Sequence, residues 1–158
     1  MKMQFNNFYK NKKILITGHT GFKGTWMLIW LIMLGAKVIG VSNKVSNNHN
    51  HFKFVYKKIL NKFKHVELDI NKPLLISKII KKTKPDIIIH MAAQALVFDS
   101  ISNPKKNFTT NIFGTINILE AARTLKNKCT ILIVSSDKSY KPSKVKKSLK
   151  EIDELGGI

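Results

Sequence analysis

Short, mainly apolar runs recur along this chain, separated by longer segments in which apolar residues have a helical spacing. The runs cover residues 13–17, 37–41, 65–68, 86–90 and 130–135. Runs in which neighbouring residues are all apolar are typical of strands that are covered on both faces of a sheet. The pattern therefore predicts five strands.

The intervening segments predict helices over residues 22–34, 54–63, 73–83 and 107–125, the second of them weak. Gly35 follows the first helix and suits the position after a helix end. Pro73 begins the third helix, which suits proline in a first helical turn. The polar, Asn-rich residues 42–51 predict a loop.

Strands that alternate with helices predict right-handed crossovers and a parallel sheet. The expected strand order is 3-2-1-4-5, with a ligand crevice at the carboxyl ends of strands 1 and 4. We therefore expect an α/β fold, a Rossmann-type doubly wound parallel sheet with five strands. Residues 1–136 are expected to form this NAD(P)-binding domain, and residues 137–158 an incomplete active-site loop region without a clear period.

A turn with three glycines, Gly18, Gly21 and Gly24, follows the first strand and precedes the first helix. Glycine permits a tight turn and lets backbone N–H groups approach phosphates closely. The N-terminus of the following helix adds partial positive charge. The spacing G-x-x-G-x-x-G differs from the commoner G-x-G-x-x-G. The turn therefore predicts a dinucleotide pyrophosphate site, with an ordinary glycine turn as the alternative.

Two further groups of residues follow predicted strands and are expected to meet the glycine turn at one edge of the sheet. Ala92 and Ala93 follow the fourth strand, and their small side chains would let a flat ligand lie against the backbone. The fifth strand is followed by a hydroxyl, a carboxyl and an amine, those of Ser136, Asp137 and Lys138. These groups suit hydrogen bonding and proton transfer, although an ordinary polar turn is the alternative.

Three single residues have a structural interpretation beside a functional one. Asp69 follows the third strand and is either a helix N-cap or an acceptor for an adenine amino group. His90 lies at a strand end, and we expect it to be a hydrogen-bonded structural histidine rather than a catalytic residue. We expect Cys129 to pack in or beside a strand rather than to act as a nucleophile. The histidines and the cysteine lack the spacing of zinc ligands, so no metal is expected.

The formal net charge is +19, with 28 lysines and arginines against 9 acidic residues. Such an excess is typical of proteins that bind nucleic acid. However, Arg123 is the only arginine and the lysines are scattered, whereas arginine is the residue that recognises guanine and phosphate bidentately. We therefore interpret the charge as a solvated lysine surface that attracts nucleotides, and expect no nucleic-acid partner.

The most apolar stretch, residues 26–34, is shorter than the roughly 20 residues that span a membrane and favours a buried helix. The start of the chain lacks an apolar segment of signal-peptide length. A single cysteine excludes an internal disulfide and fits a reducing compartment. These features predict a cytoplasmic protein without a membrane partner.

Four motifs occur in the order and rough spacing of the extended short-chain dehydrogenase/reductase family of sugar enzymes, the NAD-dependent epimerases and dehydratases. They are G-H-T-G-F-K-G at 18–24, H-x-A-A-Q at 90–94, N-x-x-G-T at 111–115 and S-D-K at 136–138. Within this family the chain most resembles the 4,6-dehydratases that act on CDP-glucose, because of Lys23, Trp26 and the S-D-K triplet.

The resemblance implies NAD as cofactor and a nucleotide sugar, CDP-glucose, as substrate. It also implies a reaction in which NAD takes a hydride from C4 of the sugar, water is lost across C5–C6, and the hydride returns to C6. The residues matched to cofactor binding are Gly18, Thr20, Gly21, Phe22, Lys23, Gly24, Asp69, Ile70, Ala92, Ala93, Gln94, Asn111 and Ser135. Full-length relatives are expected to be homo-oligomers.

By the same motif match, Ser136 would hydrogen-bond the C4 oxygen and Asp137 would protonate the departing C6 hydroxyl. Lys138 stands where relatives carry the glutamate that removes the C5 proton. A lysine can act as this base only if its pKa is lowered well below about 10.4, by desolvation or by a neighbouring cation.

The family's Tyr-x-x-x-Lys pair, which supplies the C4 base, is expected downstream of the S-D-K triplet. Tyr140 and Lys144 have this spacing, but they follow Lys138 too closely and Pro142 lies between them, so we do not assign them this role. The resemblance thus predicts the amino-terminal part of a dehydratase, with the C-terminal part of the full fold missing. Such a chain should be inactive alone. It should also expose an apolar surface on the sheet and on the helix over residues 107–125, and self-associate.

The end of the second strand bears on the choice of cofactor. Residues 41–44, Val-Ser-Asn-Lys, include no Asp or Glu for the ribose 2′-hydroxyl, and Lys44 would favour a 2′-phosphate. The resemblance nevertheless favours NAD over NADP. Two alternatives stay open: a related nucleotide-sugar dehydratase or epimerase, and a non-catalytic NAD-binding module. The absence of the Tyr-x-x-x-Lys pair fits the module, whereas the retained S-D-K triplet does not.

Overall fold

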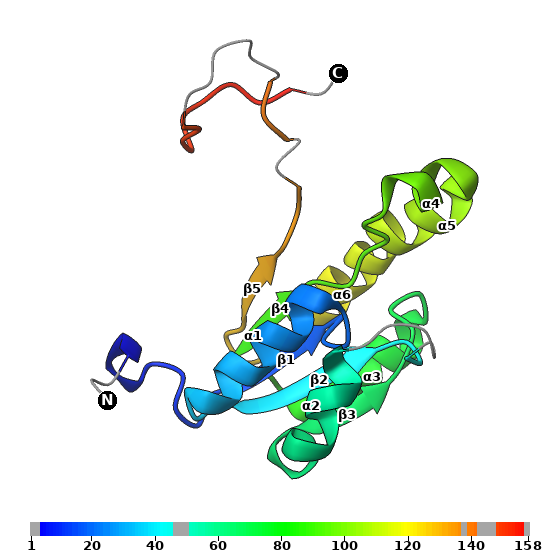
Figure 1. Ribbon diagram of the computed structural model, residues 1–158. Coiled ribbons are helices and arrows are strands. Elements are labelled where there is room, and N and C mark those ends of the chain that lie inside the picture. The colour runs from blue at the N-terminus through cyan, green and yellow to red at the C-terminus, as the bar shows by residue number, and fades with distance from the viewer. Residues whose placement is uncertain (1–3, 46–50, 137–138, 142–147, 157–158) are drawn as a thin grey trace.

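Figure 1 presents the computed structural model of the chain, which describes residues 4–45, 51–136, 139–141 and 148–156. A five-stranded sheet lies between two layers of helices. Beyond the last strand the chain leads away from the sheet (Figure 1).

The sheet consists of β1 (Lys13–Thr17), β2 (Lys37–Ser42), β3 (Lys64–Glu67), β4 (Ile87–His90) and β5 (Thr130–Ile133). Neighbouring strands pair in parallel, and their order is β3-β2-β1-β4-β5. This order confirms the predicted α/β class and topology. The direction of winding reverses between β1 and β4, so a crevice is expected at the carboxyl ends of these two strands.

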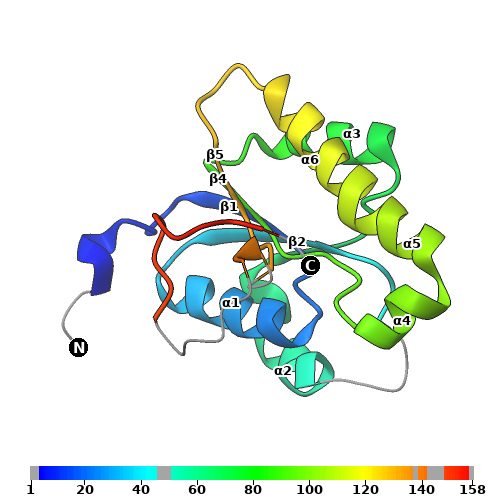
Figure 2. The same cartoon turned by 90° about the horizontal axis from the view of Figure 1, so that it is seen from above.

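The strands are connected by α1 (Phe22–Met33), α2 (His51–Ile59), η2 (Leu60–Lys62), α3 (Pro73–Thr83), α4 (Val97–Ser102), α5 (Pro104–Phe108), η3 (Thr109–Phe113) and α6 (Gly114–Arg123), and the short turn η1 (Gln4–Asn7) precedes β1. Figure 2 shows α1 and α2 on one face of the sheet and α3 and α6 on the other.

Each face of the sheet has its own apolar core. Ile14 of β1 packs with Leu28 of α1 on one face, whereas Leu15 packs with Ile118 of α6 on the other. All four side chains are almost completely buried. Because successive side chains of a strand point to opposite faces, a strand with two covered faces is apolar at every position.

The helix expected over residues 107–125 is composite and begins earlier. Its first part, α5, starts at Pro104 behind Asn103, whose side-chain oxygen accepts a hydrogen bond from the Lys106 N–H at 3.1 Å. A π-helical segment, η3, then joins α5 to α6. The sequence pattern missed this segment, because a π turn adds a residue to the helix without changing its composition.

Other boundaries differ from the predicted ones. The helix α4 was not predicted, because its apolar residues are exposed and show no buried face; Val97 is 69% and Phe98 85% exposed. The strand β2 extends to Ser42 and α2 begins at His51, so the expected loop over 42–51 is shorter. The strand β5 ends at Ile133 rather than at residue 135.

The helix α1 is buried on one side only, so the prediction of a buried helix over 26–34 was wrong for its outer face. Trp26, Trp30 and Met33 are 59%, 45% and 69% exposed. They lie on one face because residues three or four apart in a helix are neighbours. The helix ends as predicted: Gly35 has φ +78° and donates its N–H to the Ile32 carbonyl at 3.0 Å.

The outer surface of β5 and of the composite helix confirms the predicted apolar exposure. On β5, Leu132 is 52% and Ile133 38% exposed. On η3 and α6, Phe113 is 59% and Ile116 45% exposed. Whether this surface drives self-association stays a prediction.

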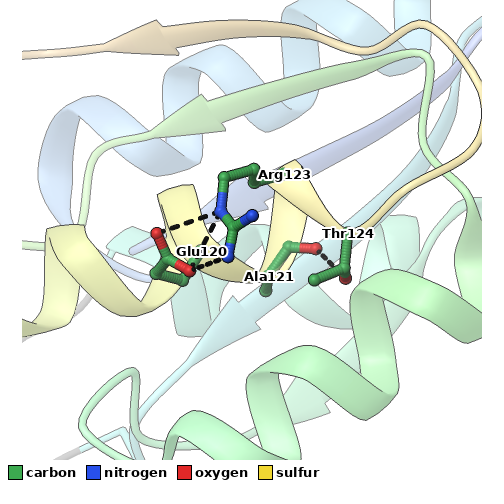
Figure 3. Close-up of polar contacts among 4 residues, drawn as sticks. All are labelled: Glu120, Ala121, Arg123 and Thr124. Atoms are coloured by element: carbon green, nitrogen blue, oxygen red, sulfur yellow. Dashed lines mark hydrogen bonds and ion pairs between the residues drawn. The ribbon is translucent and has the colours of Figure 1, made fainter.

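Figure 3 shows the last turn of α6, where the guanidinium of Arg123 donates to both carboxylate oxygens of Glu120, the shortest contact being 2.8 Å. Both side chains are exposed, so the pair adds little to stability. The only arginine of the chain is therefore engaged in a local surface pair, in agreement with the interpretation of the positive charge as a solvated surface.

Candidate functional site

The glycine turn connects the end of β1 to the start of α1. Gly18 has φ +73°, a conformation that favours glycine, and donates its N–H to the Val41 carbonyl at 2.8 Å. A Cβ atom at Gly18 would lie 2.8 Å from the backbone of Ala92, and one at Gly24 would overlap the Gly18 carbonyl oxygen. These two glycines are therefore required by close backbone packing.

Gly21 has a different role, because a Cβ atom there would meet only the Gly18 carbonyl oxygen, at a tight but not overlapping 3.3 Å. It is exposed and occupies the N-cap position of α1, where no side chain caps the helix. The first N–H groups of a helix lack partners within the helix and carry partial positive charge. The hydroxyl of Thr25, in contrast, turns back to the carbonyls of Gly21 and His19, at 2.9 and 3.1 Å. The start of α1 thus offers backbone N–H groups rather than a capping oxygen.

Two hollows lie at the carboxyl edge of the sheet. The first has a volume of about 230 Å³ and is lined by residues of the glycine turn, of the ends of β2 and β3, of the loop after β4 and of η3. They are Gly18, Thr20, Gly21, Ser42, Asn43, Leu68, Ile70, Met91, Ala92, Ala93, Gln94 and Thr110. We call it the glycine-turn hollow. Of the predicted cofactor residues, it brings together Gly18, Thr20, Gly21, Ile70, Ala92, Ala93 and Gln94.

The second hollow, of about 490 Å³, lies between the loop after β4 and the end of β5 and is lined by His90, Ala92, Ala93, Gln94, Ala95, Asn111, Thr115, Ile133, Val134, Ser135 and Ser136. We call it the Ser136 hollow. It shares Ala92, Ala93 and Gln94 with the glycine-turn hollow, so the two are adjacent. The predicted residues Asn111, Ser135 and Ser136 all line it.

The remaining predicted residues lie elsewhere. Phe22 and Lys23 are exposed in the first turn of α1 and line neither hollow, whereas Gly24 is buried beneath Gly18. Asp137 and Lys138 lie outside the described residues. Their predicted roles are therefore not tested by the geometry.

Asp69 is not a helix N-cap, so that interpretation was wrong. The N-cap position of α3 is Lys72. The Asp69 carboxylate instead accepts a hydrogen bond from the Asn71 N–H at 2.9 Å, which closes a local turn. This turn fixes the chain between Leu68 and Ile70, two residues that line the glycine-turn hollow.

A chain of hydrogen bonds holds the loop after β4. The Thr17 hydroxyl oxygen accepts from the N–H groups of Met91 and Ala92, at 3.2 and 3.1 Å, and lies 2.6 Å from Nδ1 of His90. With that oxygen accepting from both N–H groups, one tautomer satisfies every group of the chain: Thr17 donates to Nδ1 of His90, and Nε2 of His90 donates to Thr115, 3.0 Å away.

This order of donors requires a neutral imidazole at His90. Burial lowers the pKa of His90, which agrees with the neutral form. The Thr115 hydroxyl in turn donates to the Asn111 carbonyl at 2.7 Å. The structure therefore supports the structural interpretation of His90, which connects β1, β4 and the composite helix.

Asn111 holds the same loop from the other side. Its side-chain oxygen accepts from the Gln94 N–H at 2.8 Å, and its amide nitrogen donates to the Gln94 carbonyl at 3.1 Å. This pairing places the π-helical segment η3 directly against the loop that separates the two hollows. Asn111, predicted to bind the cofactor, therefore positions the backbone of Gln94.

Two residues that the sequence interpretation did not assign, Ser42 and Asn43, line the glycine-turn hollow. The hydroxyl of Ser42 lies 2.6 Å from that of Thr20, a predicted cofactor residue, and connects the end of β2 to the glycine turn. Their hydroxyl and amide groups have no distinctive pattern in the sequence, and only the position of Ser42 at the predicted strand end pointed to this place.

His19, inside the glycine turn, is completely buried and pairs with His65 of β3, with 2.8 Å between Nε2 and Nδ1. The rings of Phe52 and Phe63 pack against His19. Burial lowers the pKa of His19 to about 4, and also lowers the pKa of His65. Both rings are therefore neutral near pH 7, and His19 supports the turn from beneath.

The residues of the glycine-turn hollow fit a dinucleotide. The open N-terminus of α1 suits a diphosphate, and no side chain projects from Gly18 or Gly21 into the space that a phosphate would take. Ala92 and Ala93 present small side chains beside it. Sheet order, glycine turn and hollow together define a nucleotide-binding domain of the Rossmann type.

Comparison with known proteins gives the family. Residues 15–152 match the GDP-mannose 4,6 dehydratase family, and the chain belongs to it. It is 34% identical to the CDP-glucose 4,6-dehydratase of Salmonella typhimurium over 152 residues, which cover 96% of this chain and 42% of that protein. It is 33% identical to the CDP-paratose 2-epimerase of Salmonella typhi, covering 81% of this chain and 38% of that protein. The chain thus spans less than half the length of these relatives.

Solved structures of sugar epimerases share the fold. The UDP-glucose 4-epimerase of Brucella ovis in complex with NAD superimposes with a TM-score of 0.75 at 25% identity, covering 93% of this chain and 42% of the other. The UDP-Glc/GlcNAc 4-epimerase of Campylobacter jejuni gives a TM-score of 0.79 at 25% identity, covering 94% and 44%. The predicted resemblance to the epimerases and dehydratases is therefore confirmed.

In the described part of the chain, no helix is both long and apolar enough to cross a membrane. No group of three or more histidine, cysteine, aspartate or glutamate residues there could hold a metal ion.

Proposed function

We propose that this chain forms the NAD-binding part of a nucleotide-sugar 4,6-dehydratase that acts on CDP-glucose. The observation that carries the proposal is the adjacency of two hollows that share the Ala92–Gln94 loop, one at the glycine turn and one at Ser136. A cofactor that lies across this loop would place its reactive ring beside the residues that follow β5.

The cofactor end of the site rests on the glycine turn. The N–H groups at the start of α1 would bind the diphosphate, with Gly21 leaving the approach open. The loop of Ala92, Ala93 and Gln94 would support the nicotinamide half, held by Thr17 and Asn111. When bound, NAD would accept a hydride from the sugar and return it later in the reaction. The NAD-bound epimerase with the same fold supports this choice of cofactor.

The residues that we propose for catalysis follow β5 in the sequence. Ser136, which lines the second hollow, would donate a hydrogen bond to the C4 oxygen of the sugar. Asp137 would hold the proton that the C6 hydroxyl takes as it leaves, and Lys138 would take the proton from C5. Lys138 needs a lowered pKa for this role, and a substrate that excludes water would favour its neutral form.

The identity of the sugar nucleotide is supported by sequence similarity. The CDP-glucose 4,6-dehydratase of Salmonella typhimurium matches 96% of the chain, whereas a CDP-paratose 2-epimerase matches 81%. Because the chain spans 42% of the dehydratase, we expect turnover to need further residues that supply the C4 base. Tyr140 pairs with Leu155 in an antiparallel bridge, which is not the helical setting that a Tyr-x-x-x-Lys pair requires.

The proposal is tested by titrating NAD into the chain and into the Gly21→Asp variant, with calorimetry. Aspartate is a favourable N-cap residue and its Cβ would meet only the Gly18 carbonyl oxygen, at 3.3 Å. The variant should therefore still fold, while its carboxylate would lie where we propose that the diphosphate binds. NAD should bind the wild-type chain and bind the variant at least tenfold more weakly. Equal affinity, or no binding by folded wild-type chain, would refute the proposed cofactor site.

The substrate part of the proposal needs a separate measurement. CDP-glucose is incubated with NAD and either the 158-residue chain or a chain extended by the corresponding part of the Salmonella relative, and the 4-keto-6-deoxy product is followed by NMR. We expect product only with the extended chain. Product from an extended chain with Asp137→Asn at the wild-type rate would exclude the proposed proton donor.

A further inference from the structure

A groove of about 460 Å³ lies at the amino edge of the sheet, away from the two hollows at its carboxyl edge. Residues near the starts of β1, β2 and β3, of η2 and of the end of α3 line it: Lys13, Ala36, Lys37, Val38, Ile39, Asn61, Lys62, Phe63, Lys64 and Thr83. We call it the lysine groove. It shares no lining residue with either hollow, so a ligand bound in it would leave the proposed cofactor site free.

Four of the ten lining residues are lysines, and none of the ten is acidic. Three strands begin with one of these lysines, namely Lys13, Lys37 and Lys64, and Lys62 ends η2. All four side chains are exposed, and within the described residues none of them forms an ion pair. The sequence shows these lysines as scattered, whereas the fold brings them to one concave surface.

The strand register places two of the lysines directly beside each other. Lys13 and Lys37 are register partners in the parallel pair β1–β2, so their side chains leave the same face of the sheet. Like charges opposite each other on neighbouring strands are destabilising. Lys64 is the register partner of Ile39, two residues after Lys37, and so starts from the same face. A bound anion with several charges would relieve this repulsion.

One carboxylate, that of Asp86, adjoins the lysine groove without lining it. Asp86 is exposed and accepts the backbone N–H of Lys13 at 2.8 Å. The last turn of α3, which ends at the groove, carries Lys81 and Lys82. The positive charges here outnumber this carboxylate and exceed the partial negative charge of the helix end. The local charge therefore favours an anion.

We propose that the lysine groove binds a small soluble anion with two or more linked phosphate groups. Lysine binds phosphate as a point charge, and several lysines around one concave surface attract linked charges more strongly than a single charge. The apolar lining residues Val38 and Ile39 are only 3% and 7% exposed, so the ammonium groups supply the attraction. The volume suits a small ligand, whereas nucleic acids are bound over a far larger surface.

The test is calorimetric titration of the chain with tripolyphosphate and with orthophosphate at one salt concentration. Tripolyphosphate should bind the wild-type chain clearly more tightly than orthophosphate. In the Lys37→Gln/Lys64→Gln variant it should bind about tenfold more weakly than in the wild type, because two exposed charge pairs are lost. This variant should fold at least as well as the wild type, since it removes the repulsion between Lys13 and Lys37.

The matched control is Lys57→Gln/Lys58→Gln, which removes the same charge from exposed positions on α2. It should keep the wild-type affinity for tripolyphosphate, and both variants should bind NAD as the wild type does. Equal weakening in the two variants would show that only the net charge matters and would overturn the inference. Tripolyphosphate bound no more tightly than orthophosphate, or binding of anionic vesicles or duplex DNA without binding of tripolyphosphate, would also overturn it.

Discussion

The two ends of the sheet edge that forms the site differ in how they are supported. At the β1 end, Ile14 and Ile16 are completely buried and Thr17 holds the loop after β4. The glycine turn there is connected to β3 through His19 and to β2 through Ser42. At the β5 end, Leu132 is 52% and Ile133 38% exposed. At the β1 end the supporting groups therefore bind one another. The β5 end, where we propose the catalytic residues, instead presents apolar side chains and a strand edge to solvent.

Changing Gly24 to valine should have the largest effect, at the β1 end. A Cβ there overlaps the Gly18 carbonyl oxygen, so the turn must open and we expect unfolding to become easier by about 3 kcal/mol. Urea unfolding followed by circular dichroism measures this loss. Gly21→Ala is the control, because its Cβ would make one tight contact with the same carbonyl oxygen, at 3.3 Å, rather than overlap it. If both variants unfold at the wild-type urea concentration, the turn is not packed as described.

Acidification should weaken the same end. Burial lowers the pKa of folded His19 to about 4, from 6.5, so the unfolded chain binds the proton more tightly and stability is lost as pH falls below about 6.5. Between pH 7 and pH 5 we expect the free energy of unfolding to fall by about 2 kcal/mol from this group. Burial of His65 and His90 acts in the same direction.

The pH effect is measured by urea unfolding at each pH. The variant His19→Gln removes the buried imidazole and should show a clearly smaller dependence on pH. A wild-type chain whose stability does not change over this range would contradict the buried neutral His19–His65 pair.

Replacing Thr17 with valine should have a moderate effect at the point where the two hollows meet. The change leaves the Ala92 N–H and Nδ1 of His90 without their partner, which should cost about 1 to 2 kcal/mol. It should also weaken NAD binding, because the Ala92–Gln94 loop is released. Thr130→Val, an exposed threonine on β5, is the matched control. Equal NAD affinity of both variants would mean that the Thr17 hydroxyl does not position the loop.

Changing Leu132 to lysine should have the smallest effect on stability. Because Leu132 is already exposed, we expect the free energy of unfolding to change by no more than about 0.5 kcal/mol. Self-association, measured by analytical ultracentrifugation, should decrease. Leu60→Lys, at an exposed leucine of η2, should not have this effect. A wild-type chain that stays monomeric at high concentration would show that the β5 surface does not associate.

The prediction of the fold was most accurate for the strands that are buried on both faces and have continuous apolar runs. The strands β1, β2 and β4 are covered on both faces, so their apolar runs leave few alternatives. Prediction was poorer for α4 and η3. The helix α4 buries none of its residues, and η3 departs from the helical period to which periodicity arguments apply.

The site was only partly predictable, for a related reason. Glycine, alanine and the S-D-K triplet have distinctive spacing, and the structure places Gly18, Gly21 and Ser136 around two adjacent hollows. The supporting hydroxyls of Thr17 and Ser42 come from neighbouring strands, and only the folded chain brings them to their partners. Asn111 was assigned to the cofactor but pairs with the Gln94 backbone. A motif identifies such a residue without showing whether it binds the ligand or positions the residues that do.

The most direct measurement is a titration of the isotope-labelled chain with NAD, followed by the NMR signals of the backbone amides. We expect saturable shifts for the glycine turn, residues 18–24, and for the loop of Ala92, Ala93 and Gln94. Gly18, Thr20 and Gly21 of the turn and all three loop residues line the first hollow. The surface pair of Glu120 and Arg123 at the end of α6 should not respond. Shifts confined to other surfaces, or a well-folded spectrum that NAD leaves unchanged, would contradict the account.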